Sequence, residues 1–150
     1  MSNKRTHQAV GALAGGGLAL ALSNGQSTPH QIIEGIGGAI SGYGFGCLPD
    51  ILEPPLSPNH RSLAHGAAPG VALITICARQ LESWQSYLRT QADSQAALAE
   101  QAQTIVSELW HLFLEFLYRL LAGAVAGALG GYGSHLVLDG FSPQSLPPVA

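Results

Sequence analysis

The stretch that decides the fold is Ile105–Leu138, IVSELWHLFLEFLYRLLAGAVAGALGGYGSHLVL, in which Glu108, Glu115 and Arg119 are the charged residues. A helix needs about 20 predominantly apolar residues to cross a bilayer, and this stretch exceeds that length. Three shorter apolar stretches precede it: Ala9–Leu22, Ile36–Leu48 and Leu63–Ala78. Because they are short, they can lie tilted, half-inserted or packed inside a bundle. The pattern predicts an all-α fold, a small and membrane-embedded helical bundle.

The segments between and after the apolar stretches complete the expected order of elements. Arg79–Gln103 is polar, rich in Gln and Ala and free of Gly, which predicts one exposed helix. The third apolar stretch contains Pro69, near which a helix should begin or restart. Prolines in 140–150 predict an irregular tail. We therefore expect a single domain over residues 1–150, with about four apolar helices and one polar helix.

Composition excludes several classes of protein. Only 10% of the 150 residues are charged and the net charge is -3, whereas a soluble domain carries about 25% charged residues. A hydrophobic fraction of 47% is too high for a disordered chain. Six basic residues cannot form the basic surface that nucleic-acid binding needs. The two cysteines, Cys47 and Cys77, indicate neither a disulfide framework nor a CxxC site.

Glycines recur every four residues in three of the apolar stretches. Such spacing gives each helix a smooth face, which allows close backbone approach between membrane helices. The same faces offer a surface through which copies of the chain could associate. The repeats are Gly11 and Gly15; Gly38, Gly42 and Gly46; and Gly123, Gly127 and Gly131.

The first 25 residues also resemble a secretory signal peptide, with Lys4 and Arg5 ahead of an apolar run. We expect this segment to be retained, because His7 within it belongs to the candidate site below. The positive-inside rule then favours a cytoplasmic location for the start of the chain.

His135 and Asp139 stand four residues apart, so a helix presents both on one face. Imidazole and carboxylate are ligands of first-row metals, although a helix end closed by a hydrogen-bonded Asp has the same pattern. A second cluster has more polar groups than a connecting loop needs, which favours metal ligands: Asp50, Glu53, His60 and His65. Arg61 within it either clamps a phosphate or pairs with Glu53.

His111 and Glu115, also four residues apart, form a rival site. Glu115 and Arg119 have the same spacing, and an ion pair within the helix is the favoured interpretation for them. The expected topology tests whether the candidate ligands can meet. If the four apolar stretches cross the membrane, His7, the Asp50–His65 cluster and the His135–Asp139 pair all lie on the face that carries Lys4 and Arg5. An antiparallel four-helix bundle brings them together in the same way.

The order of these motifs resembles the YdjM-like family of inner-membrane-associated metal-dependent hydrolases. The motifs are Thr6-His7, LPDILEPP (48–55), NHRSLAH (59–65) and GYGSHLVLDGFSP (131–143). That family is regarded as distantly similar to the all-α, zinc-dependent phospholipase C and nuclease group. The resemblance implies six metal ligands: His7, Asp50, His60, His65, His135 and Asp139. Many members have Asp-x-Asp where this chain has Asp50-Ile51-Leu52, so either Glu53 replaces the second carboxylate or one metal site is altered.

Two hypotheses about function follow. In the first, one or two divalent ions, preferably zinc, activate a water that hydrolyses a phosphoester. Asp50 or Glu53 then serves as general base, Arg61 clamps the anionic oxygens, and a membrane location suggests a lipid-linked substrate. In the second, the chain is a non-enzymatic bundle packed through glycines, acting as scaffold, assembly partner or small-solute pathway. Its His and Asp residues are then caps and packing residues.

Overall fold

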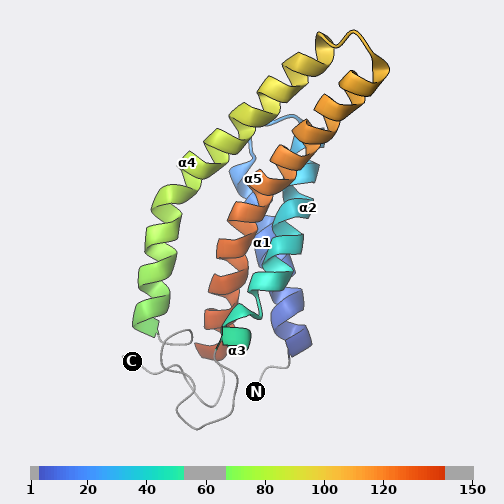
Figure 1. The fold of residues 1–150 in the computed structure, drawn as a ribbon. Coiled ribbons are helices and arrows are strands. Elements are labelled where there is room, and N and C mark those ends of the chain that lie inside the picture. Colours follow the sequence, from blue (N-terminus) through green and yellow to red (C-terminus); the bar gives the residue numbers. More distant parts are fainter. Residues whose placement is uncertain (1–3, 53–66, 141–150) are drawn as a thin grey trace.

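The computed structural model describes residues 4–52 and 67–140, and it confirms the all-α fold (Figure 1). Four long helices run alternately up and down, and a short helix follows the second of them. Consequently the start of the first helix and the end of the last lie at the same end of the bundle (Figure 1). The helices are α1 (Lys4–Leu22), α2 (Thr28–Phe45), α3 (Leu48–Leu52), α4 (Ala67–Glu100) and α5 (Ile105–Gly140).

The sequence predicted one helix in the third apolar stretch and a separate polar helix after it, and this prediction is wrong. Both belong to the single 34-residue helix α4, because no Gly or Pro follows Gly70 to interrupt it. The helix begins two residues before Pro69, which suits proline because a first-turn residue needs no hydrogen-bonded N–H. It ends at Glu100 rather than at Gln103, and a short turn leads into α5.

Helices α1, α2 and α5 meet through their glycine faces. A Cβ atom on Gly15 would lie 2.5 Å from the carbonyl oxygen of Gly38 and 2.9 Å from that of Gly127. On Gly131 it would lie 2.5 Å from the carbonyl oxygen of Gly42. Real Cβ atoms do not approach so closely, so the three backbones are in contact where a larger residue would separate them. The repeats identified in the sequence therefore pack against one another within the chain.

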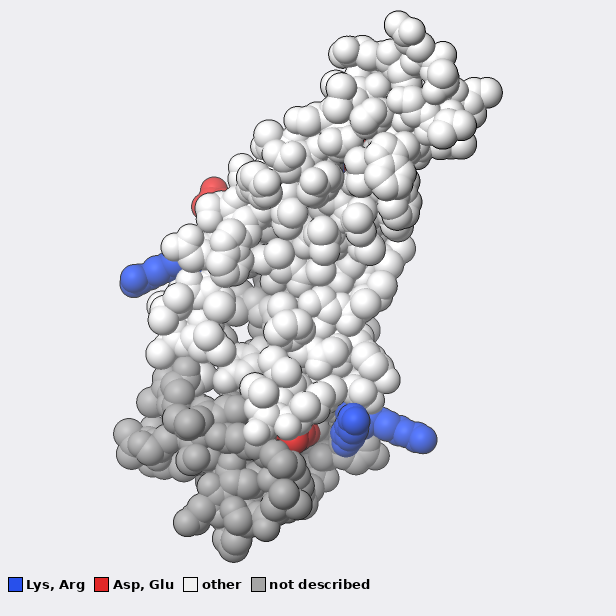
Figure 2. Space-filling model, in the orientation of Figure 1, with Lys and Arg blue, Asp and Glu red and all other residues white. Residues whose placement is uncertain are grey.

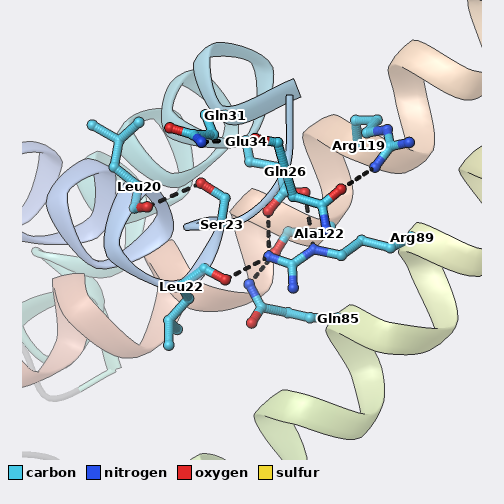
Figure 3. Close-up of polar contacts among 10 residues, drawn as sticks. All are labelled: Leu20, Leu22, Ser23, Gln26, Gln31, Glu34, Gln85, Arg89, Arg119 and Ala122. Atoms are coloured by element: carbon cyan, nitrogen blue, oxygen red, sulfur yellow. Dashed lines mark hydrogen bonds and ion pairs between the residues drawn. The ribbon is translucent and has the colours of Figure 1, made fainter. Parts of the chain in front are cut away.

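A buried polar network attaches α4 to the other long helices (Figure 3). Glu34 of α2 is 0% exposed, and both of its carboxylate oxygens accept hydrogen bonds from Arg89 of α4, at 3.0 and 2.6 Å. Arg89 also donates to the carbonyl oxygen of Leu22, at the end of α1. Four residues earlier on α4, Gln85 donates to the carbonyl oxygen of Ala122 in α5. The network therefore joins α4 to each of the other long helices.

Much of the surface lacks charge. Figure 2 shows one face on which few blue or red side chains are visible over the described residues. Large apolar side chains such as Leu13 (77% exposed), Ile40 (63%) and Val106 (79%) lie on the surface. Within 4–52 and 67–140, one helix, Ile105–Asp139, is long and apolar enough to cross a membrane. This finding is weak evidence for membrane association, and it agrees with the expectation for the longest apolar stretch.

Candidate metal centre

Three of the predicted ligands gather at one end of the bundle. His7 lies near the start of α1, whereas His135 and Asp139 lie near the end of α5. One ligand atom from each of these residues lies within 4.8 Å of the others, and all three side chains are buried. The convergence expected from an antiparallel bundle is confirmed for them. The predicted residues Glu53, His60, Arg61 and His65 lie outside the described residues.

The carboxylate of Asp139 faces the Nε2 atoms of both imidazoles. Its Oδ1 is 3.6 Å from Nε2 of His7, and its Oδ2 is 3.4 Å from Nε2 of His135. The two imidazole rings stack with their centroids 4.0 Å apart. The predicted i, i+4 pair on α5 therefore shares a pocket with a histidine that lies 128 positions from His135 in the sequence.

Gly46 positions both histidines, and the sequence did not indicate this role. A Cβ atom there would lie 2.5 Å from the backbone oxygen of His7, so glycine allows the start of α1 to lie against the end of α2. The carbonyl oxygen of Gly46 is also 2.7 Å from Nδ1 of His135. With Nδ1–H donating to that carbonyl, a neutral His135 has its lone pair on Nε2, the nitrogen that faces Asp139. Gly46 is the last member of the four-residue glycine repeat and lies just after α2. That repeat is the feature of the sequence that could have pointed to a close contact at this position.

Asp50 of α3 forms the rim of the site. Its Oδ1 is 3.7 Å from Nε2 of His135, and its side chain is 41% exposed. The predicted residue thus lies beside the buried group and also faces solvent. Water can therefore reach the carboxylate of Asp50 while this residue remains in contact with the buried histidine.

The chemistry of the donors fits a divalent ion. Two imidazoles and a carboxylate are the usual ligands of zinc and of other first-row metals. A buried carboxylate is costly unless a cation, a hydrogen bond or a metal compensates it, and Asp139 is 3% exposed. The hydrogen bond from the far nitrogen of His135 to a backbone carbonyl is the outer contact that orients metal-ligating histidines. The group of His7, His135 and Asp139 could therefore hold a metal ion.

The rival site is not formed. Nδ1 of His111 lies 2.7 Å from Oε1 of Gln95 on α4. Glu115 lies 3.2 Å from Nε2 of His30 and 3.7 Å from Nε of Arg119, so the predicted ion pair within α5 is confirmed. In the described ranges, neither His111 nor Glu115 belongs to a group that could hold a metal.

Comparisons of the chain with protein-family models, with curated proteins and with solved structures found no match. The resemblance to the YdjM-like family stays a prediction from the motifs.

Proposed function

We propose that this protein is a membrane-associated, metal-dependent hydrolase of phosphoesters. The observation that carries the proposal is the buried group of His7, His135 and Asp139, with Asp50 on its rim. In a chain in which 10% of the residues are charged, four ionisable side chains from three helices meet at one end. A purely structural role in a bundle does not require that concentration.

In this proposal the candidate residues divide the work as follows. His7, His135 and Asp139 would hold the ion, and His60 and His65 would complete the ligand set that the family resemblance implies. A divalent ion at this position, preferably zinc given the mixture of imidazole and carboxylate, supplies Lewis-acid polarisation of a phosphoryl oxygen and a lower pKa for water.

Asp50 is suited to act as general base. Its carboxylate lies beside the buried group and has access to solvent, so a proton taken from the attacking water can pass to bulk solvent. Glu53 is the other candidate for this role, and Arg61 would hold the anionic oxygens of the substrate. The phosphoester class comes from the family resemblance, and both of these residues belong to its motifs.

The apolar surface and the apolar helix α5 support a membrane location. With Lys4 and Arg5 at the start of α1, the positive-inside rule favours a cytoplasmic position for the site, and the family resemblance favours the bacterial inner membrane. A substrate that carries both a phosphate and an apolar group suits a site at this boundary.

A non-enzymatic scaffold is the competing function, and the glycine contacts among α1, α2 and α5 favour it. Metal content separates the two. We expect purified protein to retain zinc, and Asp139→Asn and His135→Gln each to lose most of it. Matched controls are Asp93→Asn and His111→Gln, which change the same residue types away from the site. Retention of the metal by both site variants, or absence of metal from the unaltered protein, would favour the scaffold.

Activity requires its own measurement. Zinc-loaded protein in detergent should hydrolyse at least one of a phosphomonoester, a phosphodiester and a phospholipid, and Asp50→Asn should slow that reaction by about 100-fold or more. Turnover that is unchanged by Asp50→Asn would contradict the role given to this carboxylate.

A further inference from the structure

An elongated apolar groove lies between α4 and α5. Its volume is about 320 Å³, within the range typical of ligand pockets. Residues from both helices line it, with Phe45 and Leu48 beside them. Among the lining residues are Leu73, Cys77 and Trp84 of α4 and Val125, Leu129 and Tyr132 of α5.

The groove and the candidate metal centre share one face of α5. Val125, Ala128 and Tyr132 line the groove, and His135 and Asp139 continue the same series at spacings of three and four residues. Such spacing places side chains on one side of a helix. The apolar face of α5 therefore leads directly to the two buried ligands.

The end of α2 and the start of α3 also connect the groove with the candidate metal centre. Phe45 and Leu48 line the groove; Phe45 immediately precedes Gly46, whose carbonyl contacts His135. Leu48 lies two residues before Asp50 on α3. Residues that line the groove are therefore close in sequence to residues that contact the site.

The far end of the groove is marked by Trp84. Leu73 and Trp84 are 11 residues apart on α4, which corresponds to about 16 Å along a helix axis. An apolar space of this length suits an extended hydrocarbon chain, because apolar contact is non-directional. Its described lining offers few polar atoms that could position a polar solute.

We propose that the groove binds the single long hydrocarbon chain of an amphipathic phosphoester whose phosphate lies at the metal centre. This inference rests on the proposed function and names the substrate class of the same site. The charged metal centre suits the phosphate of such a molecule, and the apolar groove suits its hydrocarbon chain. Imidazoles and the ion they would hold attract the phosphate, whereas the groove takes the chain out of water. Chain length then becomes the feature that the protein selects.

Binding is tested with Trp84 as the reporter. In a Trp110→Phe background, Trp84 is the remaining tryptophan, and we expect dodecyl phosphate brominated near its chain end to quench it saturably in zinc-loaded protein. Ala128→Phe should raise the half-saturating concentration by about tenfold or more, since it fills the groove. Cys77→Phe provides a second variant with the same expectation. Ala72→Phe, an exposed position outside the lining, is the matched control.

Equal quenching by the butyl analogue, or by a brominated neutral detergent, would overturn the inference. So would retention of wild-type quenching in both the Ala128→Phe and Cys77→Phe proteins.

Hydrolysis assays with long-chain and short-chain phosphates distinguish a failure of the groove proposal from a failure of the proposed hydrolase function. We expect KM for hexadecyl phosphate to rise about tenfold or more in Ala128→Phe, with KM for butyl phosphate unchanged and zinc content retained. Chain-length-dependent quenching without turnover of any phosphoester would support the groove and contradict the hydrolase. Turnover with no dependence on chain length would support the hydrolase and contradict the groove.

Discussion

Glu34 shows how much a single residue contributes to this fold. Its side chain is 0% exposed, and its partner Arg89 is 19% exposed. Removing one member of a buried ion pair leaves the other charge uncompensated. We expect Glu34→Gln to lower the free energy of unfolding by about 3 kcal/mol, measured by denaturant titration in detergent with circular dichroism as the readout.

Asp93 provides the contrast at the same scale. It pairs with Arg119, but its own side chain is 69% exposed, and the buried Arg119 keeps its contacts with Glu115 and Gln26. Asp93→Asn should therefore change the free energy of unfolding by no more than about 1 kcal/mol. Equal losses in Glu34→Gln and Asp93→Asn would show that burial does not determine the strength of these pairs.

At the scale of the helices, packing depends on glycine faces. A Cβ on Gly127 would overlap the backbone of Gly38, so Gly127→Ala should separate α5 from α2. We expect a loss of about 1–3 kcal/mol in the free energy of unfolding, as for other overpacked interiors. Thermal unfolding in detergent measures it.

Gly17 is the control for this substitution. A Cβ there has nothing within 4 Å, and alanine favours the helix by about 1 kcal/mol. Gly17→Ala should therefore leave stability unchanged or raise it. A loss equal to that of Gly127→Ala would mean that helix contact is not the cause.

Local sequence determined most of the elements. Apolar stretches separated by turns indicated α1, α2 and α5, whereas the division of α4 was predicted wrongly because a change in polarity does not break a helix. The His135–Asp139 pair was predicted because i, i+4 spacing is local. The Glu34–Arg89 pair was not predicted, since its partners are 55 residues apart and nothing in either segment indicates the other. The contact between the carbonyl oxygen of Gly46 and His135 was not predicted for the same reason, because 89 positions separate the two residues.

For the whole molecule, the alternating direction of the long helices makes a prediction about topology. If the bundle spans a membrane, the start of α1 lies on one side and the turn between α4 and α5 on the other. In a Cys47→Ser, Cys77→Ser background, Lys4→Cys and Gln103→Cys should react with an impermeant maleimide from opposite sides of sealed vesicles. Labelling of both from the same side would contradict a spanning arrangement and favour a bundle that rests on one surface.

The central claim is that helix ends from opposite parts of the chain form one metal site. Anomalous scattering from crystals of the zinc-loaded protein, measured at the zinc edge, tests it most directly. We expect a strong peak about 2.0–2.2 Å from imidazole nitrogens of His7 and His135 and a carboxylate oxygen of Asp139. A zinc-loaded crystal with no peak within bonding distance of these three residues would contradict it.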